Sequence, residues 1–135
     1  MNRRFVPTAV HGIFDYLGGV GLIASPFIFG FSSMGGTAVI LPIVLGVGLL
    51  AYSLLTNYET GVPMLRFIPM RVHLVFDFVA SAFLCVAPFL FGYSNQGLNV
   101  WLPQVIAGVG VMGLVLVSQT DPQPTEKVLA AKVTA

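Results

Sequence analysis

The sequence predicts an all-α integral membrane protein whose four transmembrane helices form two similar hairpins. Three observations carry this prediction: an apolar composition, two long intervals without charge, and an internal repeat. Of the 135 residues, 56% are hydrophobic and 8% are charged, and the mean hydropathy is +0.92. A soluble domain has roughly 45–50% apolar and about 25% charged residues. Most of this chain is therefore expected to lie in lipid.

The same composition excludes several other classes of protein. Disordered chains are polar and rich in charge, which this chain is not. Cys85 is the only cysteine, so a disulfide scaffold is excluded. The net charge of +1 provides no basic surface for nucleic acid. We therefore expect the lipid bilayer, and no nucleic acid, as a partner.

Two intervals of the chain lack Asp, Glu, Lys and Arg, and each is long enough for two spans. They cover residues 16–58 and 78–120, whereas one spanning helix needs about 20 apolar residues. Turn-forming segments interrupt them at residues 32–37 and 93–99. We predict helices near residues 8–31, 38–57, 69–92 and 100–119.

The chain repeats itself after 62 residues, which is the step from His11 to His73. Each repeat contains two predicted spans, so both repeats begin on the same side of the membrane. This arrangement predicts parallel repeats related by a pseudo-two-fold axis along the membrane normal. The predicted units are a first hairpin at residues 1–64, a second hairpin at 65–121 and a cytoplasmic tail at 122–135.

Positively charged residues predict the orientation of the bundle. All of them lie in the amino-terminal segment, the middle loop or the tail: Arg3, Arg4, Arg66, Arg71, Lys127 and Lys132. Cytoplasmic loops carry the excess of Lys and Arg. We therefore expect both termini in the cytoplasm, with plasma (inner) membrane as the location. Tyr58 is expected at the inner membrane interface.

Residues 24–31 (Ala-Ser-Pro-Phe-Ile-Phe-Gly-Phe) and 86–93 (Val-Ala-Pro-Phe-Leu-Phe-Gly-Tyr) occupy equivalent positions in the two repeats. They resemble the signature of the SPW-repeat membrane proteins, named for Ser-Pro-Trp in the first of two membrane helices per repeat. The resemblance covers about residues 4–121, although phenylalanine replaces the tryptophan in both repeats and alanine replaces the serine in the second. It implies an integral membrane hairpin repeat and no established activity. The motif residues expected to shape the helix ends are Ser25, Pro26, Phe27, Ala87, Pro88 and Phe89.

Paired glycines recur in the second helix of each repeat, as Gly46 and Gly48 and as Gly108 and Gly110. Small residues allow helices to approach closely in lipid, so these glycines are interpreted as packing positions. An unwound, ion-binding segment is the alternative.

His11 and Asp15 recur as His73 and Asp77, and they are the candidate functional residues. A spacing of four places both side chains on one helix face. An Asp at the bilayer centre costs roughly 2.5–3.5 kcal/mol, so the pairs should face the bundle interior. The repeat brings them to one depth, which predicts contact between His11 and Asp77 or between His73 and Asp15.

Three hypotheses for this polar cluster follow. The favoured one is a structural or interaction module in which the cluster, near the cytoplasmic side, joins the helices and needs no cofactor. The second is a proton or ion channel or transporter subunit, since histidine titrates near neutral pH. The third is a metal or haem site at His11 and His73. A homo-oligomer or a membrane protein partner fits any of the three.

The sequence offers no support for an enzyme. It contains no serine or cysteine with a base at motif spacing and no phosphate-cradling glycine loop. We therefore predict no catalytic residues.

Overall fold

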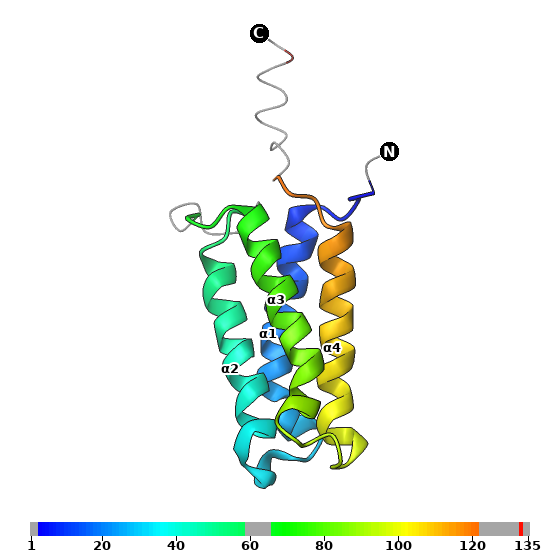
Figure 1. Ribbon diagram of the computed structural model, residues 1–135. Coiled ribbons are helices and arrows are strands. Elements are labelled where there is room, and N and C mark those ends of the chain that lie inside the picture. Colours follow the sequence, from blue (N-terminus) through cyan, green and yellow to red (C-terminus); the bar gives the residue numbers. More distant parts are fainter. Residues whose placement is uncertain (1–2, 59–65, 122–132, 134–135) are drawn as a thin grey trace.

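The computed structural model describes residues 3–58, 66–121 and 133, in which four helices lie side by side as a bundle (Figure 1). The first hairpin consists of α1 (Thr8–Ile28) and α2 (Gly36–Leu54), with the short 3₁₀ helix η1 (Ser32–Met34) between them. The second hairpin consists of α3 (Met70–Leu90) and α4 (Leu98–Val117). The predicted tail at residues 122–135 lies outside the described residues except for Val133.

Three of the four helices have the length and composition of membrane spans. By these criteria α2, α3 and α4 can each cross a membrane. α1 has 21 residues, as α3 does, and it is less apolar because it combines His11 and Asp15 with several glycines. The four helices of the bundle confirm the predicted all-α membrane fold.

The two hairpins are related by the pseudo-two-fold symmetry that the sequence repeat predicts. Val6, just before α1, forms an isolated backbone bridge with Ser118, just after α4. Ile68, just before α3, forms the equivalent bridge with Thr56, just after α2. Each bridge joins one repeat to the other, and the residues of the two bridges differ by the 62-residue step. The start of each hairpin is therefore fixed to the end of the other.

Glycine ends the first helix of each repeat, which corrects the predicted helix ends at residues 31 and 92. Gly30 and Gly92 both adopt a left-handed φ of 74°. The motif proline lies two residues before the last residue of each helix. Its carbonyl accepts a hydrogen bond from the backbone N–H of the residue after the glycine. These bonds run from Phe31 to Pro26 and from Tyr93 to Pro88, both at 2.9 Å. This is the hydrogen-bond pattern of a Schellman cap.

The prolines inside the helices remove backbone donors, and side chains replace two of them. Pro26 has no N–H for the carbonyl of Leu22, and the Ser25 hydroxyl donates to that carbonyl at 2.8 Å. In the second repeat Ala87 has no hydroxyl to do the same. The motif residues Phe27 and Phe89 point outward, with 64% and 63% of their surface exposed.

A buried polar pair lies in the half of the bundle near the α3–α4 turn. Pro42 in α2 cannot donate to the carbonyl of Ala38, and the Gln104 Nε2 of α4 donates there instead at 3.2 Å. The Tyr93 hydroxyl donates to Gln104 Oε1 at 2.9 Å. Burial raises the pKa of Tyr93 to about 12, so the hydroxyl keeps its proton. This pair connects the hairpins away from the charged end.

One glycine of each predicted packing pair allows two helices to touch. A Cβ placed on Gly46 would lie 2.6 Å from the carbonyl oxygen of Gly19. A Cβ on Gly108 would lie 2.7 Å from the carbonyl oxygen of Ser81. Gly48 and Gly110 have open space beside them. Close packing therefore involves Gly46 and Gly108 but not their neighbours.

This difference gives a matched pair of variants. Gly46→Ala should destabilise the protein by about 1–3 kcal/mol, because the methyl group would force α1 and α2 apart. Gly48→Ala should leave stability unchanged or raise it by up to about 1 kcal/mol, since alanine is the better helix former. Thermal unfolding of the two variants in detergent checks this order, and equal melting temperatures would contradict it.

A buried candidate site of two histidines and two aspartates

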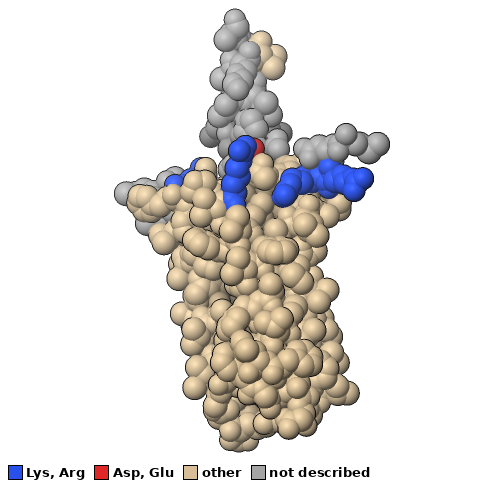
Figure 2. Space-filling model, viewed as in Figure 1, with Lys and Arg blue, Asp and Glu red and all other residues tan. Residues whose placement is uncertain are grey.

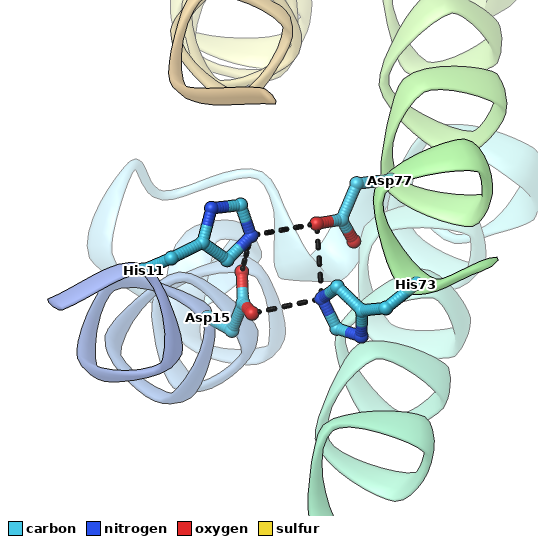
Figure 3. A group of neighbouring side chains, drawn as sticks. All are labelled: His11, Asp15, His73 and Asp77. Atoms are coloured by element: carbon cyan, nitrogen blue, oxygen red, sulfur yellow. Dashed lines mark hydrogen bonds and ion pairs between the residues drawn. The ribbon is translucent and has the colours of Figure 1, made fainter. Parts of the chain in front are cut away.

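The four predicted polar residues meet between α1 and α3, as Figure 3 shows. His11 and Asp15 project from α1, and His73 and Asp77 project from α3. Each histidine lies three residues after the first residue of its helix, so the group is near the end of the bundle where both hairpins begin. All four residues are at most 3% exposed. We refer to them as the quartet.

The shortest contacts within the quartet cross from one repeat to the other. Nε2 of His11 lies 2.9 Å from Asp77 Oδ2, and Nε2 of His73 lies 2.9 Å from Asp15 Oδ2. Within the helices, Nε2 of His11 is 3.3 Å from Asp15 Oδ1, and Nε2 of His73 is 3.0 Å from Asp77 Oδ2. Both cross-repeat contacts expected from the sequence are therefore present.

The outer nitrogen of each histidine ring contacts a hydroxyl group from the other repeat. Nδ1 of His11 is 2.6 Å from Ser118 Oγ, and Nδ1 of His73 is 2.8 Å from Thr56 Oγ1. Each hydroxyl donates its own proton to the backbone carbonyl four residues earlier, at 2.7 Å. A hydroxyl has one proton to donate, so each oxygen accepts a hydrogen bond from an Nδ1–H. This contact sets the tautomer of both rings.

Two tyrosines donate to the carboxylates, and both belong to the first repeat. The Tyr58 hydroxyl donates to Asp15, and the Tyr52 hydroxyl donates to Asp77. Burial and the neighbouring Asp15 raise the pKa of Tyr58, so it remains a donor. The Tyr58 oxygen also lies 2.7 Å from Nε2 of His73. The equivalent positions in the second repeat are Leu114 and Thr120.

The geometry requires a proton or a cation between each ring and the carboxylate that it faces. A neutral ring with its proton on Nδ1 presents a lone pair at Nε2, which would repel the facing carboxylate oxygens. A proton on each Nε2 removes the repulsion and gives two imidazolium–carboxylate pairs with no net charge. A bound cation has the same effect. The quartet is therefore chemically suited either to hold protons as an ion-paired cluster or to bind a metal ion.

The quartet is close to a crevice between the hairpins. A cavity of about 260 Å³ is lined mainly by residues of α2 and α3, among them Asp77 and Tyr52. The remaining lining is apolar apart from Ser81 and includes Leu45 and Leu84. The quartet is thus buried in protein but has an apolar cavity at one side.

Four residues of the site were not predicted to contact the quartet: Tyr52, Tyr58, Thr56 and Ser118. Tyr58, expected at the membrane interface, is completely buried. The hydroxyl residues Thr56 and Ser118 occupy equivalent positions in the two repeats, and this shared chemistry is the signal that could have found them. The tyrosines have no such signal because the equivalent positions of the second repeat are leucine and threonine.

Comparison with known proteins gives one match. The family model described as the SPW repeat domain matches residues 9–118, a range that includes the whole quartet. No curated protein and no solved structure matches the chain.

The tyrosine contacts generate a second matched pair of variants. Tyr58→Phe removes a buried donor to Asp15 and should cost about 1–3 kcal/mol of stability. Tyr16→Phe is the control, since the Tyr16 hydroxyl makes only a 3.5 Å contact with the Ser53 carbonyl. Thermal unfolding in detergent should show a clear drop for the first variant and little change for the second. Equal effects would mean that the Asp15 contact contributes nothing measurable.

Proposed function

Because the chain belongs to the SPW-repeat family of membrane proteins, we propose that it is a structural or interaction module of the membrane, in which the quartet joins two helical hairpins. The supporting observation is the pair of 2.9 Å contacts that run from each histidine to the aspartate of the other repeat. Partners of this module would be lipid, a second copy or another membrane protein.

The packing of the bundle explains why such a connection is needed. Within each hairpin the helices touch closely at Gly46 or Gly108. Crevices lie between the hairpins, among them one of about 260 Å³ beside α2 and α3 and one of about 560 Å³ beside α1 and α4. In lipid, helices are held together by packing and by interhelical hydrogen bonds rather than by the hydrophobic effect. The quartet and its hydroxyl partners supply bonds where the packing is looser.

Proton or ion transport is the alternative function, and the quartet would be the proton- or ion-binding site at the cytoplasmic end of the path. Conduction needs polar groups that continue across the midplane. In the described part of the chain, no hydrogen bond joins the quartet to the outer pair formed by Tyr93 and Gln104. Leu84, an apolar residue only 3% exposed, lies on α3 between the two. These observations favour the structural function.

We also propose that both termini face the cytoplasm, with the inner (plasma) membrane as the location. The described cations Arg3, Arg4, Arg66 and Arg71 all precede the first helix of a repeat or lie in its first turn. Figure 2 shows the described positive charges gathered at one end of the molecule, and the described surface of this face is otherwise uncharged away from that end. The positive-inside bias assigns that end to the cytoplasm.

The structural function predicts an order of stability among quartet variants. Asp15→Asn removes one negative charge and leaves an unbalanced buried histidine, which should cost about 3–5 kcal/mol. Adding His73→Leu removes the partner at 2.9 Å, so the double variant should be more stable than the single one. Thermal unfolding in detergent, with a metal chelator present, gives the order.

Arg71→Gln is the control for these variants. It breaks an ion pair with Asp121 in which both side chains are more than 70% exposed, and such pairs contribute about 0–1 kcal/mol. If Asp15→Asn is as stable as this control, the quartet does not hold the hairpins together.

The orientation has its own test. Of two reporters fused after Ala135, one active only in the cytoplasm and one active only in the periplasm, the cytoplasmic reporter alone should show activity. A fusion after Gly97, in the turn between α3 and α4, should show the opposite activity. Periplasmic activity at Ala135 would reverse the orientation without changing the number of spans.

A further inference from the structure

We propose that the quartet binds one divalent transition-metal cation, for which Zn²⁺ is the reference ion. Nε2 of His11, Nε2 of His73 and one carboxylate oxygen from each of Asp15 and Asp77 would be the ligands. The inference rests on the proposed structural function, because the metal would connect the same four residues across the two hairpins.

The donor atoms already converge on one point. Candidate ligand atoms of the four residues all lie within 4.8 Å of one another, and the contacts between nitrogen and oxygen are 2.9–3.3 Å. Bonds of about 2.0–2.2 Å around Zn²⁺ place neighbouring tetrahedral ligands roughly 3.3–3.5 Å apart. The nitrogen–oxygen contacts therefore need to lengthen by a few tenths of an ångström, and the widest pair of donors, up to 4.8 Å apart, must close to the same separation. The Tyr58 oxygen, 2.7 Å from Nε2 of His73, is a fifth donor within reach.

The surroundings of the quartet are those of metal-binding histidines. Such histidines donate their second ring N–H to an oxygen, which fixes the tautomer and points the other nitrogen at the metal. Here Ser118 and Thr56 accept from the two Nδ1 atoms at 2.6 and 2.8 Å. Their own protons go to backbone carbonyls. Both Nε2 lone pairs are thereby directed into the quartet, an observation independent of the convergence of the ligands.

Charge and burial define the class of ion. Two carboxylates balance a divalent cation, so the loaded site is neutral, which favours burial inside a membrane protein. Ca²⁺ and Mg²⁺ need six or more oxygen ligands or retained water, and this site offers two nitrogens and two carboxylates in a buried position. Imidazole with carboxylate suits first-row transition metals. Haem does not fit, since Asp15 and Asp77 occupy the space between the rings.

The test uses the full chain, purified in detergent, stripped with a chelator and titrated with Co²⁺. We expect one equivalent of Co²⁺ per chain, with visible ligand-field absorption that disappears when Zn²⁺ is added. The melting temperature of the stripped protein should rise on addition of Zn²⁺. His11→Asn should abolish the absorption.

Two further variants keep the test decisive if the ligand variant fails to fold. Ser118→Ala retains all four ligands and removes the acceptor that orients His11, so Zn²⁺ affinity should fall 10–100-fold with the stoichiometry unchanged. Ser81→Ala is the control, because the Ser81 hydroxyl donates to the carbonyl of Phe78 and makes no contact with the quartet. Its affinity should equal that of the original chain.

The outcomes separate the metal from the structural function. If the stripped protein binds neither Co²⁺ nor Zn²⁺, or if Ser118→Ala and His11→Asn bind them unchanged, the metal inference is overturned. The stability order of the Asp15 and His73 variants in chelator would still stand as the test of the structural function. If that order fails while one equivalent of metal binds, the metal site stands and the metal-free quartet does not hold the hairpins together.

Discussion

Four ionisable side chains in a membrane protein must find every partner within the protein, and this requirement organises the bundle. A single helix cannot meet it. His11 and Asp15 share a face of α1, yet their contact of 3.3 Å is longer than the 2.9 Å contact that each makes with the other repeat. The ring nitrogens that point away from the quartet are bonded to hydroxyls that follow the second helices. The depth and the rotation of each of the four helices at this end therefore depend on those of the others.

The same requirement explains polar residues elsewhere in the helices. Proline in a lipid-embedded helix leaves a carbonyl without its donor, and lipid offers no substitute. The Ser25 hydroxyl donates to the carbonyl that lacks a donor because of Pro26. Gln104, on a different helix, donates to the carbonyl that lacks a donor because of Pro42. The serine of the Ser-Pro motif thus has a local role beside the proline that follows it. The Gln104 contact shows that a backbone hydrogen bond missing in one hairpin is replaced by a side chain of the other.

Much of the architecture is predictable from the sequence, because absence of charge and regular spacing are long-range signals. The uncharged intervals predict the spans, and the 62-residue step predicts the symmetry and the meeting of the quartet. Other features depend on three-dimensional details that spacing does not report. Which glycine of a pair touches the neighbouring helix is decided by rotation of the helix, and Gly46 differs from Gly48 for that reason. The Tyr58 contact depends on the path of the chain after α2, which no periodic pattern encodes.

The tyrosine contacts make the two halves of a repeated molecule chemically unequal. Two identical hairpins related by an exact two-fold axis would supply two histidines and two aspartates at one depth, so a dimer of single hairpins would also complete the His–Asp ring. Joined in one chain, the halves are free to differ, and Tyr52 and Tyr58 have Leu114 and Thr120 as their counterparts. The bundle consequently has two distinguishable flanks. The flank with Tyr52 and Tyr58 supplies both hydroxyl donors to the aspartates and the described residues of the other flank supply none, a difference that a symmetric dimer of hairpins does not allow.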